Sequence, residues 1–156
     1  MKPKMYRKDL LTNDDIWNAM ISTVSEYDFP TGNQTADEAF LVFQYYSELE
    51  SGGHESLLTW FSEHVEEVGA ASYLDALVAA LEAVGAYDYA AIENKYGHDM
   101  WQKHKALENG EIEEKEFYAV IEQADGEYYQ LDGRISELLE TFFVDVHTEL
   151  IDVIKD

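Results

Sequence analysis

Apolar residues recur along most of this chain at the three- and four-residue spacing of amphipathic helices. Near the N-terminus, Ile16, Met20 and Val24 mark one such face, and Thr12 before two aspartates is typical of a helix start. The last stripe runs from Ile135 to Val153. The pattern predicts helices over residues 12–25, 35–51, 54–68, 71–84, 87–96, 99–108, 111–123 and 134–154.

Turn residues separate these predicted helices. The second helix opens on a predicted capping box from Thr35 to Glu38. Glycine-containing breaks follow the helices at Gly52-Gly53, Gly69, Gly85, Gly97, Asn109-Gly110 and Asp125-Gly126. No alternating run of useful length predicts a strand. We therefore expect an all-α fold, a single compact domain of about seven to eight helices in an antiparallel helical stack.

The two ends of the chain differ in charge. Residues 1–11 hold four of the ten Lys and Arg residues and form a predicted basic N-terminal arm. Residues 12–156 form the predicted acidic helical domain. The chain is 46% hydrophobic and 13% aromatic, which is enough apolar surface for a folded core despite the high charge.

The charge itself is unusual. The formal net charge is −23, from 33 acidic and 10 basic residues. From Leu11 to Asn94 there is no Lys or Arg but there are sixteen Asp and Glu residues, where an average domain would carry about ten cations. A surface of one sign projects a long-range field that steers basic partners. The sequence therefore favours a binding protein whose charged surface contacts its partner.

Carboxylates on rigid helices can imitate a duplex. DNA-binding proteins meet phosphates mainly with Lys and Arg, and helix positions three or four apart hold charges at a related spacing. The predicted partner-binding residues are Asp14, Asp15, Glu63, Glu66, Glu67, Glu111, Glu113, Glu114, Glu116, Asp145, Glu149 and Asp152. Each row is also compatible with a solvated helix face. Asp14, Asp15 and the Glu111 group are compatible with stabilisation of a helix N-terminus as well.

Several chemistries have no support in the sequence. There is no cysteine, which excludes disulfides and thiolate sites. The five histidines (His54, His64, His98, His104 and His147) stand in neither a Glu-x-x-His nor a His-Glu-x-x-His pattern. No nucleotide-binding or nucleophile motif occurs. We expect no catalytic residues, no metal site and no cofactor, and therefore not an enzyme.

The sequence also limits where the protein is expected to act and which partners it is expected to bind. No apolar run approaches the length of a membrane span, and no secretion signal follows the basic N-terminus. We expect a cytoplasmic protein with no membrane contact. Direct nucleic-acid binding is not expected, because the only basic segment is the first ten residues.

The order of several motifs resembles a known family. These motifs are Glu48 to Gly53, Trp60-Phe61, Ala83 to Ala86 and Ala124 to Tyr129. The sequence resembles the bacterial DNA-mimic protein family of the neisserial type over about residues 35–151, although Ser51 and His54 stand where that family has asparagine and an aromatic residue. The resemblance implies an all-helical homodimer that occupies the DNA-binding surface of a transcription factor.

Three functional hypotheses follow from the charge. The first is a DNA mimic that blocks a basic DNA-binding protein. The second is an immunity-type inhibitor that covers the active cleft of a basic toxin or nuclease. The third is acidity as an adaptation to high salt, which predicts unfolding at low ionic strength.

Overall fold

The computed structural model describes residues 2–155. In this part of the chain there are six α-helices, α1 (Asn13–Ser25), α2 (Gln34–Val68), α3 (Ala70–Ala83), α4 (Tyr87–Glu108), α5 (Glu114–Gln130) and α6 (Arg134–Leu150). A short 3-10 helix spans Arg7–Asp9, and two strands, β1 and β2, span Lys4–Tyr6 and Asp152–Ile154. The all-α class is confirmed, with six helices rather than seven or eight. Met1 and Asp156, the outer ends of the two predicted segments, lie outside the described residues.

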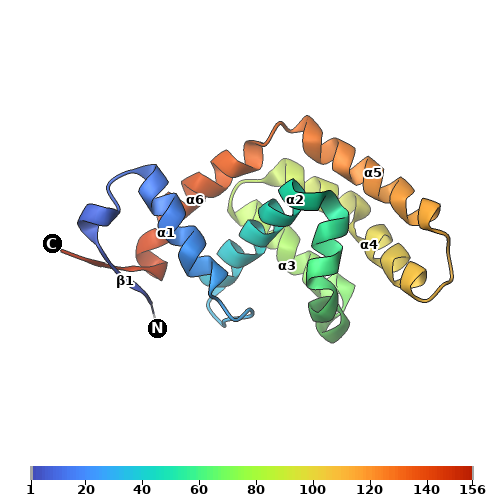
Figure 1. Cartoon of the computed structure of the whole chain (residues 1–156), viewed down its shortest axis with the longest axis horizontal. Helices are drawn as coiled ribbons and strands as arrows, with labels where there is room; N and C mark the ends of the chain where they lie inside the picture. Colours follow the sequence, from blue (N-terminus) through green and yellow to red (C-terminus); the bar gives the residue numbers. More distant parts are fainter. Residues whose placement is uncertain (1, 156) are drawn as a thin grey trace.

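The helices form an elongated arrangement (Figure 1). Helices α2, α3, α4 and α5 pack each on the next, and α6 returns to pack on α1 and α2. Both ends of the chain lie at one end of the long axis, and the loop between α4 and α5 lies at the other. The core includes Tyr45, Leu77 and Phe143, each buried completely. No described helix has the length and apolar character that a bilayer span requires.

Side-chain caps decide where the first two long helices begin. Before α1, Thr12 Oγ1 accepts a hydrogen bond from the Asp15 amide at 3.1 Å, and the Asp15 carboxylate accepts one from the Thr12 amide at 3.3 Å. This confirms the predicted start. Before α2, Asn33 Oδ1 accepts from the Ala36 amide at 3.0 Å. The predicted capping box beginning at Thr35 is therefore wrong, because Asn33 supplies the cap earlier in the chain.

Two glycines predicted to end helices lie inside them instead. Gly97 is buried within α4, and a Cβ there would lie 2.7 Å from Leu74 Cδ2 of α3. Gly97 therefore allows close packing of two helices and does not stop one, so the predicted helices 87–96 and 99–108 are a single helix. Likewise α5 continues through Gly126 to Gln130, and it begins at Glu114 rather than at residue 111.

The C-terminal segment was predicted as helix to residue 154, but α6 ends at Leu150. Ile151 is extended and buried, and β2 pairs in parallel with β1. Val153, predicted to be buried, is 36% exposed. Part of the predicted basic arm, Lys4–Tyr6, thus pairs with the end of the chain. Three-residue strands are too short to leave an alternating pattern in the sequence.

Candidate functional site

The most unusual local structure is a kink in α2. Gly52 (φ −158°, ψ 19°) and Gly53 (φ 72°, ψ −163°) leave the helical conformation. The backbone at Gly53 lies in a region that only glycine adopts without strain. A Cβ at this position would also lie 2.5 Å from Asp125 Oδ2 of α5. The predicted break at Gly52-Gly53 is therefore present, as a kink pressed against α5.

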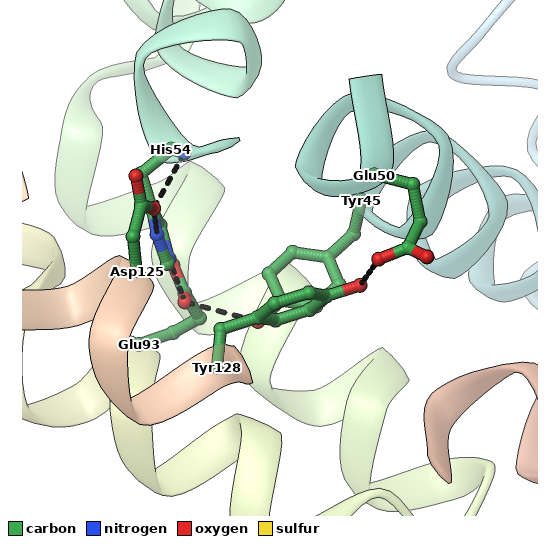
Figure 2. Close-up of polar contacts among 6 residues, drawn as sticks. All are labelled: Tyr45, Glu50, His54, Glu93, Asp125 and Tyr128. Atoms are coloured by element: carbon green, nitrogen blue, oxygen red, sulfur yellow. Dashed lines mark hydrogen bonds and ion pairs between the residues drawn. The ribbon is translucent and has the colours of Figure 1, made fainter. Parts of the chain in front are cut away.

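The first residue beyond the kink, His54, lies between two carboxylates. Its Nε2 atom is 2.6 Å from Glu93 Oε2 of α4, and its Nδ1 atom is 2.6 Å from Asp125 Oδ1 of α5. The His54 backbone amide also donates to Asp125 Oδ1 at 2.9 Å. Figure 2 shows the imidazole held between the two acids. Asp125 therefore fixes both the backbone and the ring of the residue that follows the kink.

The carboxylates determine the charge of His54. Burial lowers the pKa of the imidazole, but the nearby Glu93 and Asp125 outweigh burial and raise the pKa to about 9. His54 is therefore a buried imidazolium at neutral pH. A buried charge of this kind is retained only where partners compensate for the lost hydration.

Two buried tyrosines extend the contacts of this site. Tyr45 Oη donates to Glu93 Oε2 at 3.2 Å, and Tyr128 Oη donates to Glu50 Oε2 at 2.9 Å. Burial raises the pKa of both phenols, and Glu93 and Glu50 raise it further, so both remain protonated donors. The two rings meet edge to face at 6.0 Å (Figure 2). Residues before and after the kink are thus tied to α4 and α5.

We call the set His54, Glu93, Asp125 and Tyr45 the kink network. His54 and Glu93 are 0% and 1% exposed, so a substrate cannot reach the imidazole. In the described part of the chain, no group of His, Asp and Glu side chains has the arrangement of a metal site. The kink network joins the two sides of the kink in α2 to α4 and α5.

Little in the amino-acid sequence indicates the kink network. In the sequence, His54 is one of five histidines without a metal-binding spacing and departs from the family pattern, and Asp125 belongs to a predicted turn and to a family motif; neither position indicates a contact between the two. Glu93 carried the one usable signal, because it lies four residues from both Tyr89 and Gly97 on the apolar face of α4. An acid at such a position must find a partner inside the protein.

Two of the predicted acidic rows lie on helices that contact each other, α2 and α5. Glu63, Glu66 and Glu67 are exposed on α2 beyond the kink. On the same half of α2, Glu55 accepts a hydrogen bond from Tyr118 Oη of α5 at 2.7 Å. This bond raises the pKa of Tyr118, and the charge of Glu114 contributes as well. Tyr118 thus joins α5 to Glu55, which precedes the α2 row along the helix. The other row lies at and just before the start of α5, and its members are Glu111, Glu113, Glu114 and Glu116, all exposed.

The remaining predicted residues lie at the other end of the molecule. Asp145 and Glu149 are on the second half of α6, and Asp152 is in β2; all three are exposed. Figure 1 shows this segment, and the start of α1 with Asp14 and Asp15, at the end opposite to the start of α5. The structure therefore does not gather all the predicted residues in one place.

Three of the predicted residues have neighbours within the chain. Asp152 lies 4.0 Å from Lys2, and Glu113 lies 3.3 Å from Lys115. Asp15 belongs to the capping box of α1. Exposed ion pairs of this kind contribute little stability, about 0–1 kcal/mol, and exchange readily for other partners.

The fold and the site define an acidic, all-helical protein whose kinked helix carries carboxylates on its outer face. A family model described as DMP19-like protein matches residues 32–147, which includes the kink, all of α2 to α5 and most of α6. The chain therefore belongs to the DMP19-like protein family, which is the DNA-mimic family. This is a family of proteins that bind other proteins, not of enzymes. No curated protein and no solved structure matches the chain.

Proposed function

We propose that this protein binds the DNA-binding surface of a basic partner, such as a transcription factor, and blocks its access to DNA. The observation that carries the proposal is the exposed row Glu63, Glu66 and Glu67 on the half of α2 that follows the kink. Helices α1, α2 and α3 contain no Lys or Arg. Lys105 of α4 lines the same hollow as Glu66, but among the described residues no ion pair joins the two. Family membership supports the class of function, and the charge pattern supports the mode of binding.

The geometry of α2 suits a phosphate-like array. Positions four residues apart on a helix are separated by about 6 Å along its axis, within reach of successive cations of one partner. The kink network holds this half of α2 against α4 and α5, so little conformational freedom is lost on binding. We propose that the α2 and α5 rows make the main contact and that the rows near α1 and α6 extend it.

Binding should depend on where the charges lie. With the chain as bait, we expect capture of a basic DNA-binding protein that duplex DNA displaces and that dissociates as salt rises. Changing Glu63→Gln, Glu66→Gln and Glu67→Gln together should weaken binding of the captured protein about tenfold, because exposed ion pairs contribute about 0.2–1 kcal/mol each. Isothermal titration calorimetry measures the difference.

The matched control removes three exposed carboxylates elsewhere, by Asp75→Asn, Glu82→Gln and Glu137→Gln. Its net charge equals that of the α2 variant. If both variants lost the same binding affinity, the position of the carboxylates would not matter. Binding would then depend only on the net charge of the protein, which would contradict the proposal. Capture of partners that DNA does not displace would favour the toxin inhibitor instead.

We further propose that the protein is a homodimer that acts in the cytoplasm, without direct contact with nucleic acid or a membrane. Exposed apolar residues support an interface at the end that holds the strands; these are Tyr6, Leu11, Val153 and Ile154. Because two chains of charge −23 repel each other, salt should strengthen the dimer while it weakens partner binding. Light scattering at micromolar concentration tests this, and a monomer at every salt concentration would refute it.

A further inference from the structure

Trp60 is a large aromatic residue with an open face. It lies on α2 beyond the kink and is 49% exposed. Its ring packs against Phe40 and Phe61, at centroid distances of 5.9 Å and 5.0 Å, so these two rings hold the indole in place. Fixed, partly exposed tryptophans commonly anchor protein interfaces. The acidic rows described above do not account for Trp60.

Two open hollows meet at Trp60. One, of about 350 Å³, is largely aromatic and includes Tyr27, Phe29 and Phe40 in its lining. The other, of about 360 Å³, is lined by Glu48, Gly52, Glu55, Ser56 and Thr59 as well as Trp60. The indole therefore has a largely aromatic hollow, which Asp28 also lines, on one side and two carboxylates on the other. We call Trp60, Glu48 and Glu55 the Trp60 patch.

The kink creates the acidic side of this patch. In a straight helix, Glu48 and Ser56 would be separated by about 12 Å along the axis. Here Ser56 Oγ donates to Glu48 Oε2 at 3.0 Å across the kink. Gly52 lies between them, where a Cβ would be only 3.0 Å from Ser56 Cβ. A side chain at this position would crowd the hollow.

Both carboxylates of the patch are held in fixed orientations. Glu48 accepts from Ser56, and Glu55 accepts from Tyr118. An ionised carboxylate has about four acceptor positions, so each keeps free ones for a partner. Within the described residues, neither carboxylate forms an ion pair. The patch therefore combines an aromatic face with two oriented, uncompensated negative charges.

We propose that the Trp60 patch accepts an arginine side chain of the basic partner. The guanidinium stacks on the indole, and its N–H groups donate to Glu48 and Glu55. Arginine suits the patch better than lysine, because its planar group stacks on aromatic rings and donates in a fixed fork, whereas the lysine ammonium is a strongly hydrated point charge. The inference rests on the proposed function and names the side chain that this surface selects.

Two peptides of equal charge test the selectivity on the full chain. One alternates glycine and arginine, and the other alternates glycine and lysine. At physiological ionic strength, calorimetry should show the arginine peptide binding about three- to fivefold more tightly, as expected for an exposed cation–π contact. Equal affinities for the two peptides would overturn the proposal.

Variants then locate the selectivity. Glu48→Gln with Glu55→Gln should reduce the affinity for the arginine peptide to about that for the lysine peptide. Trp60→Leu, which keeps an apolar contact with Phe40, should do the same. The control pair Asp75→Asn with Glu82→Gln changes the charge equally at exposed positions of α3 and should preserve the preference for arginine. Loss of the preference in the control alone, or in all variants equally, would overturn the proposal.

The outcomes separate this inference from the proposed function. If a DNA-displaceable partner is captured and the Glu48 and Glu55 changes do not weaken it, the function stands and the arginine site is wrong. If the peptides are distinguished but no DNA-binding partner is captured, the arginine site stands and the function is wrong. If the Glu48 and Glu55 changes instead dissociate a homodimer, the patch binds a second copy of this chain, and the proposal is overturned.

Discussion

Replacing His54 by alanine is expected to lower the free energy of unfolding by about 3–5 kcal/mol, the range found when one member of a buried ion pair is removed. The substitution leaves Glu93 buried without its cation, and it removes the ring that joins α2 to α4 and α5. Because small domains are stable by only about 5–15 kcal/mol, this is a large share of the total. Urea unfolding followed by circular dichroism measures it.

The matched control is His98→Ala. His98 is exposed on α4, so the same side chain is removed where it has no buried partner. A change within about 0.5 kcal/mol is expected there. A loss at His54 no larger than the loss at His98 would show that the kink network does not stabilise the fold.

The free energy of unfolding, measured at several pH values, provides a second test of the role of His54. The folded protein keeps the imidazole proton up to about pH 9, whereas the unfolded chain releases it near 6.5. The contribution of His54 is therefore fully present below pH 6.5 and is lost as pH rises through 9. At 1.36 kcal/mol per pH unit, the free energy of unfolding should fall by roughly 3 kcal/mol at most across this window. His98→Ala should keep this slope, and His54→Ala should lose it.

Replacing Gly53 by alanine is expected to cost at least about 3 kcal/mol. The backbone at φ 72° and ψ −163° strains any residue with a Cβ by about 1–3 kcal/mol. The added methyl group would also meet Asp125 Oδ2 at 2.5 Å and displace it from His54. The pKa of His54 should therefore fall together with the stability. Chemical denaturation and an NMR titration of the imidazole measure the two effects.

Gly126→Ala supplies the same methyl group at a permissive position. Gly126 is exposed inside α5, and a Cβ there meets no atom within 4 Å. Alanine is favoured over glycine in a helix interior, so this variant should be more stable by about 0.5–1 kcal/mol. If the two alanine variants changed stability in the same direction and to the same extent, the kink would not require glycine.

The kink network connects the interior of this DNA-mimic family member to its surface. His54 and Asp125 fix the bend, and the bend brings Glu48 beside Ser56. A variant that disrupts the kink network should therefore disturb both the Trp60 patch and the α2 row. The buried charge thus supports an interaction surface that it does not itself contact.

The sequence determined the features that arise locally. The three- and four-residue periodicity identified the helical class. The cap at Thr12 and the glycines at 69 and 85 located helix ends, and Gly53 located the kink in α2, because capping and positive φ depend on residues close in the chain. The absence of Lys and Arg from Leu11 to Asn94 indicated an acidic surface, since most charged side chains remain in solvent, although Glu93 in this run is buried. The motif order also indicated the family.

Only the tertiary structure decided what depends on distant residues. Gly97 could not be distinguished from a helix stop until Leu74 of α3 was seen to occupy the space above it. The pairing of β1 with β2 joins the two ends of the chain. Likewise His54, Glu93 and Asp125 are separated by 39 and 32 residues and meet only because α2, α4 and α5 pack together. Contacts of this range leave no periodic signal, because their spacing is set by the packing of helices and not by the geometry of one.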